Sequence, residues 1–261
     1  MRYLPLIITA LLLAACSDDK DAVHPPASVD KLYNEAHDLL DTGKYKDAVK
    51  GFEEVERQHP YSEWATRAEV MAGYSAYRGG QFDQAVTILQ RFSKMHPGNS
   101  DAPYAYYLIA LCYYEQISDV GRDQKMTEQA LSALTEVVKR FPDSEYARAA
   151  KLKLDLTYDH LAGKEMQVGR YYLTRDEYLA AINRFRYVVE NYQTTTHVPE
   201  ALYRLVECYL KLGVDDEAKK YASVLGYNYA DSPWYKDAYT LMQPKTAQND
   251  KPEGFFGRMM P

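Results

Sequence analysis

Cysteine and tryptophan are scarce in this chain, with three and two residues respectively among 261. The sequence contains no CxxC pair, no HExxH pair and no GxxxxGK phosphate-binding loop. Its six histidines are scattered, and its many acidic residues have the spacing of solvated helix faces and caps. We therefore predict a binding protein with no metal and no cofactor. The alternative from another class, a peptidoglycan- or lipid-modifying enzyme, would require a polar pocket with a perturbed carboxylate.

A basic surface is missing as well. The chain has 31 Lys and Arg against 37 Asp and Glu, a formal net charge of −6, which argues against nucleic acid as a partner. No apolar run is long enough to cross a bilayer as a helix. The longest such run, Leu4 to Ala15, follows Arg2 and fits the apolar part of a secretory signal.

The end of this run, Leu-Ala-Ala-Cys at residues 13–16, resembles the bacterial lipobox. We expect residues 1–15 to be a signal peptide and Cys16 to be lipidated; an ordinary signal that leaves a free cysteine is the alternative. Ser17, in place of Asp, favours sorting to the outer membrane. Acyl chains would then anchor the protein in the inner leaflet at the periplasmic face. Residues 16–29 are polar and proline-bearing, so they would form a tether.

What the chain does contain is a repeat. An alanine follows a Gly- or Asp-rich turn at residues 48, 85, 130, 181 and 218, with spacings of 37, 45, 51 and 37 residues. Such periods are typical of helical solenoids. We predict an all-α, right-handed superhelical solenoid of about five hairpins, closed by a capping helix over Pro233–Met242. Residues 30–142 would hold repeats one to three; residues 143–243 would hold an extra helix, repeats four and five and the cap.

Two spacings are too long, and each points to an irregularity. The turn in repeat three is lengthened to the loop Ile117–Met126, which either carries function or is a tolerated insertion. Before repeat four lies a surplus amphipathic helix, Ser144–Ala162. Gly163 either ends it or lies within one long helix, and we favour the long helix. Apolar residues of the surplus segment include Ala147, Leu152, Leu154, Leu156 and Leu161.

Three smaller features carry expectations. Cys112 and Cys208 fall on the first helices of different repeats, too far apart to bridge, so we expect both to be small buried side chains. The 25 tyrosines suit half-exposed seams between helices, although some of them would line a concave surface. The tail of residues 244–261 is expected to be disordered, with Phe255–Phe256 belonging either to a docking peptide or to an idle terminus.

Within repeat one, Ala36, Ala48, Phe52 and Pro60 match the tetratricopeptide repeat offset for offset. Nearly the whole chain resembles the family of outer-membrane assembly lipoproteins known as BamD, ComL or YfiO. The resemblance is carried by the signal with Cys16, the QHPYSEWA exit, the GRDQ loop and above all Val168–Tyr192, VGRYYLTRDEYLAAINRFRYVVENY. The tail and the Gln193 that ends repeat four depart from the family pattern.

The resemblance implies a scaffold of the β-barrel assembly machine, with other assembly-machine lipoproteins as further partners. Its C-terminal half would bind the POTRA region of a BamA-like subunit, with Arg184 and Arg186 as contacts; a merely solvated Arg184 is the alternative. Its N-terminal repeats would receive the C-terminal segments of unfolded outer-membrane proteins, on Tyr74, Tyr77, Tyr104 and Tyr107. Another tetratricopeptide lipoprotein, such as a pilotin-like factor for secretin or pilus assembly or a regulator of cell-wall synthesis, is the alternative function.

Overall fold

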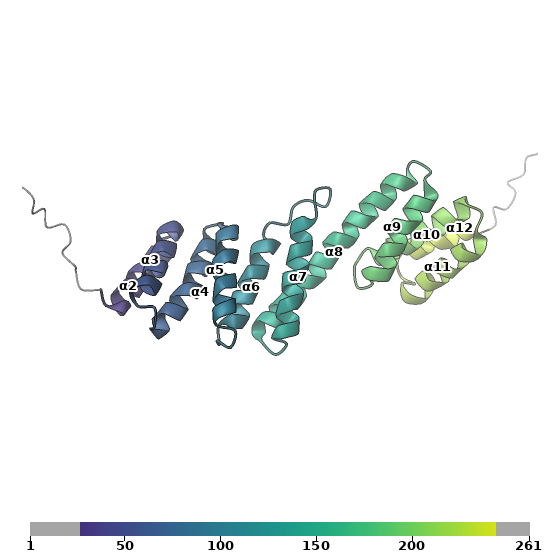
Figure 1. The fold of residues 1–261 in the computed structure, drawn as a ribbon. Coiled ribbons are helices and arrows are strands. Elements are labelled where there is room, and N and C mark those ends of the chain that lie inside the picture. Colours follow the sequence, from purple (N-terminus) through teal and green to yellow (C-terminus); the bar gives the residue numbers. More distant parts are fainter. Residues whose placement is uncertain (1–26, 244–261) are drawn as a thin grey trace, which may run out of the picture. The chain divides into compact units, whose positions relative to one another are not determined.

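The computed structural model describes residues 27–243, and this part of the chain consists of helices without strands (Figure 1). The predicted all-α fold is confirmed. The helices are α2 (Val29–Asp41), α3 (Tyr45–Gln58), α4 (Glu63–Arg78), α5 (Phe82–Met95), α6 (Ala102–Tyr114), α7 (Lys125–Arg140), α8 (Glu145–Leu173), α9 (Tyr178–Asn191), α10 (Val198–Lys211), α11 (Asp215–Asn228) and α12 (Pro233–Met242).

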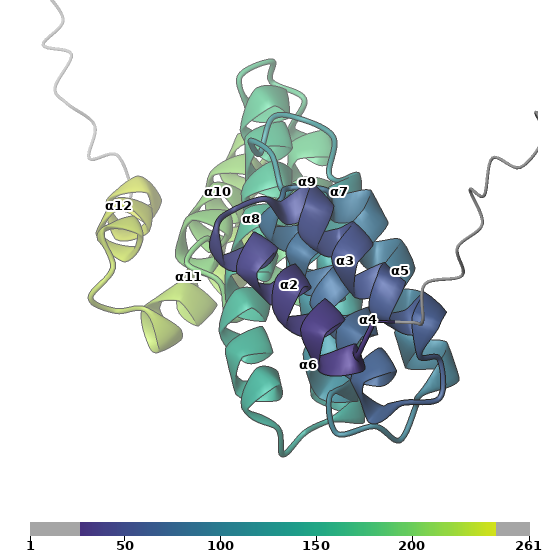
Figure 2. The same ribbon diagram turned by 90° about the vertical axis from the view of Figure 1, so that its left-hand side faces the viewer.

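The helices pair in hairpins, as the repeat predicts. Helices α2 and α3 lie side by side in both views (Figure 1 and Figure 2), and α6 packs on α7, α8 on α9 and α10 on α11. Helix α12 packs on α10 and α11 and closes the array at the predicted residues. The repeated alanines hold the hairpins together, because all five are fully buried: Ala48, Ala85, Ala130, Ala181 and Ala218.

Small residues set how closely the helices of the first hairpin approach. Ala36 on α2 is buried, and a Cβ built on Gly51 of α3 would lie only 2.8 Å from the Ala36 Cβ. Such a contact is too short for two methyl groups, so only glycine fits opposite Ala36. Phe52, the next residue along α3, is fully buried in this hairpin and stacks edge-on against Tyr33.

Four of the five turns between paired helices, all but the long α6–α7 loop, have a left-handed backbone at one residue. Gly43, Gly80 and Gly213 take φ values of 75°, 69° and 73° there, where glycine has no steric penalty. The fourth hairpin uses Asp176 at φ 59° instead. Its carboxylate accepts a hydrogen bond from the Tyr178 hydroxyl at 2.6 Å, which helps to hold the turn.

The chain divides into two compact units, one ending at Ile88 and the other beginning at Leu89. Within the second unit, helix α8 contributes to two separate apolar cores. Its first half joins α6 and α7 through Ala150 and Leu154, and its second half joins α9 to α12 through Ala162 and Met166. The predicted functional division at residue 142 stays a prediction.

Residues 145–173 form one uninterrupted helix, so the prediction of a single long helix is confirmed. Gly163 does not break it. A Cβ there would lie 3.2 Å from His197 Nε2, so this glycine allows the start of α10 to approach α8. The loop between α6 and α7 ends at Gln124, because Lys125 and Met126 already belong to α7.

The apolar face expected for the surplus segment is only partly correct. Ala147 and Leu161 are buried and Leu154 is partly buried, but Leu152 and Leu156 are 70% and 60% exposed. Their spacing of four residues places them together on another face of α8. The two apolar cores to which α8 contributes take in Ala150, Leu154, Ala162 and Met166, and Leu152 and Leu156 belong to neither.

Candidate functional site

Arg184, the main candidate for a partner contact, lies on α9 and is 44% exposed. Its Nη1 donates to Glu165 Oε2 on α8 at 3.1 Å, and the Glu165 side chain is 20% exposed. A guanidinium carries five N–H donors, and this contact uses one of them. Arg184 is therefore oriented by α8 while most of its donors remain available to a carboxylate of another protein.

Arg186, the second candidate, lies two residues further along α9. Residues two apart on a helix do not face each other, so the two arginines are not brought together. Arg186 Nη2 donates to Asn183 Oδ1 at 3.1 Å, and its Nε lies 3.8 Å from Glu190 Oε1. Both contacts are within α9, and the Arg186 charge also acts on Tyr209 of α10 and Tyr221 of α11, where it opposes the rise that burial causes in their pKa values.

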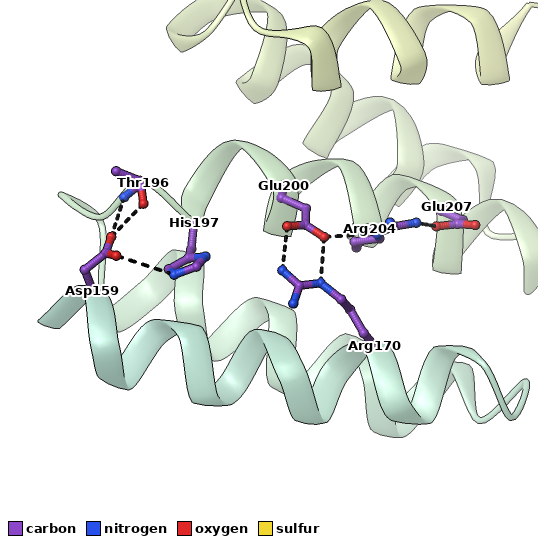
Figure 3. A network of polar contacts seen from close by, with 7 residues as sticks. All are labelled: Asp159, Arg170, Thr196, His197, Glu200, Arg204 and Glu207. Carbon is purple, nitrogen blue, oxygen red and sulfur yellow. Dashed lines mark hydrogen bonds and ion pairs between the residues drawn. The ribbon is translucent and has the colours of Figure 1, made fainter. Parts of the chain in front are cut away.

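Charged residues of alternating sign link α8 to α10 (Figure 3). Arg170 makes a bidentate contact with Glu200, from Nε to Oε1 at 2.8 Å and from Nη2 to Oε2 at 2.7 Å. Arg204 Nε lies 3.5 Å from the same Glu200 Oε1, and its Nη1 donates to Glu207 at 2.8 Å. Burial acts to raise the pKa of Glu200, but the hydrogen bonds and charges of Arg170 and Arg204 outweigh it and hold that pKa below its ordinary value.

Arg204 extends this contact to the last helix. Its guanidinium lies over the rings of Tyr203 and Trp234, at 5.2 Å and 5.6 Å from their centres, and the two rings are 5.4 Å apart. Sequence reasoning did not single out Arg170, Glu200 or Arg204. The available signal was the spacing of Glu200 and Arg204, which suits an ion pair within a helix.

A second polar contact holds the start of α10 against α8 (Figure 3). Asp159 Oδ1 accepts hydrogen bonds from the Thr196 backbone N–H at 3.0 Å and the Thr196 hydroxyl at 2.7 Å. Its other oxygen lies 3.6 Å from His197 Nε2. A carboxylate near a helix N-terminus is favourable, so this contact fixes where α10 begins.

Tyr104 and Tyr107 belong to a surface that we call the aromatic ridge: Tyr104, Tyr107 and Tyr114 on α6 with Tyr146 on α8. The ring centre of Tyr146 lies 5.3 Å from that of Tyr104 and 5.7 Å from that of Tyr107. Lys153 Nζ is 4.2 Å from the centre of the Tyr114 ring. Burial raises the pKa of both Tyr107 and Tyr146, so their hydroxyls remain protonated near neutral pH. The ridge offers half-buried aromatic faces beside one cation.

Tyr74 and Tyr77 lie on α4, in the first unit. The Tyr74 hydroxyl accepts from Arg78 Nη1 at 2.8 Å, and Arg78 also lies over the Tyr45 ring at 5.7 Å. Tyr77 packs against Phe82, with ring centres 6.0 Å apart. The four tyrosine candidates thus form two pairs, one in each unit.

Grouping and burial decide whether the metal-ligating and nucleophilic side chains of the described part of the chain can react. Residues 27–243 contain no group of three His, Cys, Asp or Glu residues placed to hold a metal ion. Cys112 and Cys208 form no disulfide and are buried, as predicted, and burial raises the pKa of the Cys208 thiol to about 12. Such a thiol is protonated and unreactive at neutral pH.

The membrane-related predictions depend on residues at the ends of the chain. Cys16, the signal peptide and most of the tether precede residue 27, and the tail follows residue 243, so all of them lie outside the described residues. Over residues 27–243, no helix is both long and apolar enough to cross a membrane.

Comparison with known proteins gives one consistent family. The family model for the outer membrane lipoprotein YfiO matches residues 25–225. The outer membrane protein assembly factor BamD of Caulobacter vibrioides is 50% identical over 239 residues, which cover 90% of this chain and 78% of the relative. BamD of Rickettsia prowazekii is 50% identical over 238 residues, covering 91% and 95%. Among solved structures, a tetratricopeptide-repeat protein of Thermus thermophilus covers 82% of this chain and 98% of its own, at TM-score 0.39 and 19% identity.

Proposed function

This chain belongs to the YfiO family of outer membrane lipoproteins, and from that membership we propose that it acts in the assembly of outer membrane proteins. The observation that carries the proposal is the 50% identity to the assembly factor of Caulobacter over 90% of the chain. The fold supports a scaffold and not an enzyme. Stacked hairpins present long helical surfaces for binding, and the polar contacts of α8 and α10 hold helices together rather than meeting in a reactive pocket.

We infer that the protein is held at the periplasmic face of the outer membrane by lipid on Cys16. The Leu-Ala-Ala-Cys motif supports this assignment. Radiolabelled palmitate is expected to enter the wild-type chain and not a Cys16→Ser variant, which should also leave the membrane fraction. Equal labelling of the two chains would place the acyl group elsewhere.

For the partner contact, we propose that Arg184 donates to a carboxylate in the POTRA region of a BamA-like subunit. Its exposure and its orientation by Glu165 support the role, because an oriented guanidinium loses little entropy when it binds. When the Arg184→Glu variant is purified from detergent-solubilised envelope, at least tenfold less of this subunit should co-purify with it than with the wild type.

The control for this experiment is Arg57→Glu, because Arg57 is also exposed and also pairs with a carboxylate, Glu54, on the protein surface. It should leave co-purification unchanged, and both variants should keep the wild-type circular dichroism spectrum. If Arg184→Glu co-purifies as well as the wild type, Arg184 does not belong to the contact.

For the substrate contact, we propose that the aromatic ridge, and separately the Tyr74–Tyr77 pair, receive apolar and aromatic C-terminal segments of unfolded outer membrane proteins. Aromatic side chains offer large contact area at low conformational cost, and Lys153 beside Tyr114 adds a positive charge. A photo-crosslinking amino acid at Tyr107 should form adducts with a nascent porin. Tyr227, which is 90% exposed on α11, is the control position and should form few. Adducts mainly from Tyr227 would contradict this placement.

A further inference from the structure

The two irregularities of the repeat pattern meet at one place in the second unit. The loop between α6 and α7 lies against the middle of α8, where Lys164 Nζ donates to the Gly121 carbonyl at 3.1 Å. Between them is a cleft of about 410 Å³, lined by Asp119 and Val120 of the loop, Leu156, His160 and Gly163 of α8, and His197 at the start of α10. Loop and surplus helix therefore build one concave feature.

The loop wall of this cleft is held in one shape by its own hydrogen bonds. Asp119 Oδ1 accepts from the Gly121 N–H at 2.7 Å. Gln124 Nε2 donates to the Val120 carbonyl at 3.2 Å and to the Arg122 carbonyl at 2.9 Å. Because the loop is already ordered in the free protein, little conformational entropy would be lost when a ligand binds against it. This property favours a binding site over a tolerated insertion.

Beyond the cleft, one face of α8 is uncovered. Residues 152, 156, 159 and 163 follow one another at helical spacing, so they lie on one face. Helix α10 begins beside Gly163, which His197 approaches, and its residue Glu200 contacts Arg170. The remainder of the face exposes Leu152 and Leu156, 70% and 60% accessible.

The charges around these leucines have a definite order. Arg148 and Lys151 lie toward the N-terminal end of α8, and Asp155 and the loop residue Asp119 lie toward its middle. All four are exposed, and within residues 27–243 none of them forms an ion pair. His160 Nε2 is buried in the same cleft and has no hydrogen-bond partner in the described chain. The surface thus presents a basic end at Arg148 and Lys151, followed by the two leucines with Asp155 between them and Asp119 beside the cleft.

We propose that this α8 groove, the face from Arg148 to Asp159 with the cleft beside it, binds one amphipathic helix of another protein. Leu152 and Leu156 are exposed and four residues apart, the spacing at which apolar side chains of one helix form a ridge that packs against another helix. The face is about 17 Å long, or three helical turns. The partner helix carries two Leu-like side chains four residues apart over Leu152 and Leu156. An acidic residue meets Arg148 and Lys151, and a basic residue meets Asp155.

The α8 groove is separate from the Arg184 contact. Glu165, which orients Arg184, is nine residues from Leu156, or two and a half turns of α8, so the two side chains leave the helix on opposite sides. The inference therefore goes beyond the proposed function and does not depend on Arg184.

The test uses the full-length, membrane-anchored chain with a photo-crosslinking amino acid at Leu152 or at Leu156, and at Tyr227 as control. We expect both groove positions to form adducts with one segment of one protein, at least tenfold above the control. Mass spectrometry should show that the segment carries apolar residues four apart with charges in the complementary order. Asp155→Lys should reduce the Leu152 adduct at least tenfold, whereas Asp216→Lys, at a fully exposed site on α11, should not.

Several outcomes would overturn the proposal. The first is a yield of adducts at Leu152 and Leu156 no higher than at Tyr227. The second is an adduct with lipid, with a second copy of this chain or with a segment of an unfolded substrate. The third is a Leu152 adduct that still forms in the Asp155→Lys variant. Because Leu152, Asp155 and Leu156 are exposed, the variants should keep the wild-type melting temperature, so a lost adduct reports on binding and not on folding. Co-purification through Arg184, measured on the same membranes, should stay at the wild-type level.

Discussion

The Glu200→Ala variant is expected to lose about 2–3 kcal/mol of stability, because removing one partner of a largely buried ion pair leaves the others uncompensated. Glu200 is only 12% exposed and contacts both Arg170 and Arg204. Without its carboxylate, the two guanidinium groups would face each other across α8 and α10. The expected loss lies below the range of about 3–5 kcal/mol for a fully buried pair, because Arg170 is 42% exposed and stays partly hydrated.

Urea denaturation followed by circular dichroism measures this loss. Asp216→Ala is the matched control, because Asp216 pairs with Lys219 at 3.6 Å but is 99% exposed. Surface pairs of that kind contribute about 0–1 kcal/mol, so the control should unfold close to the wild type. If the two variants were equally stable, the α8–α10 contact would contribute no more than a surface pair.

The same pair predicts how stability depends on pH. The pKa of Glu200 is lower in the folded protein than in the unfolded chain, where a glutamate titrates near about 4.3. Its stabilisation is therefore complete above that value and is lost as the pH falls through the lower, folded pKa. The difference in unfolding free energy between wild type and Glu200→Ala should be constant from pH 6 to pH 7 and shrink below about pH 4.

Gly169→Val is expected to destabilise the fourth hairpin by about 3 kcal/mol, the upper end of the usual cost of overpacking. A Cβ on Gly169 would overlap the ring of Phe185, which is fully buried between α8 and α9. The ring cannot move aside, because it also packs in the core formed by α8 to α12. Valine gains little helix propensity over glycine to offset the clash.

A double-mutant cycle separates this contact from other effects. Phe185→Ala alone should cost about 3–5 kcal/mol, through the cavity that it leaves. In the double variant the valine occupies part of that cavity, so the combined loss should be about 2 kcal/mol less than the sum of the two single losses. Additive losses would show that the Phe185 ring is not what excludes a side chain at residue 169. Gly98→Val, with no atom within 4 Å of its added Cβ, serves as the control and should be nearly neutral.

The sequence alone was sufficient for the architecture, because buried alanines at helical hairpin spacing leave little choice of packing. Ala48, Ala130 and Ala218 each occupy the position where two helices touch, and all are fully buried. The start of α12 and the continuity of α8 were also predictable, since Pro233 starts a helix well and one glycine seldom stops a long one.

The interhelical contacts were not predictable in the same way. Arg170 and Glu200 are 30 residues apart, and Arg184 and Glu165 are 19 apart, so their pairing depends on how α8, α9 and α10 pack. Leu152 and Leu156 belong to the amphipathic pattern of the surplus segment, but apolar spacing does not show whether another helix covers them. Their exposure depends on which part of α8 its neighbours cover, and the residue pattern does not determine that.

The continuity of α8 has a mechanical consequence. A hydrogen-bonded helix of 29 residues is stiff, and each half of α8 packs in a different apolar core. A tilt or an axial rotation imposed on one end must therefore appear at the other. Tyr146 of the aromatic ridge and Glu165, which orients Arg184, lie on this same helix. We therefore expect a displacement of Tyr146 to be accompanied by a displacement of Glu165 and of the Arg184 side chain that it orients, because the helix is continuous between them.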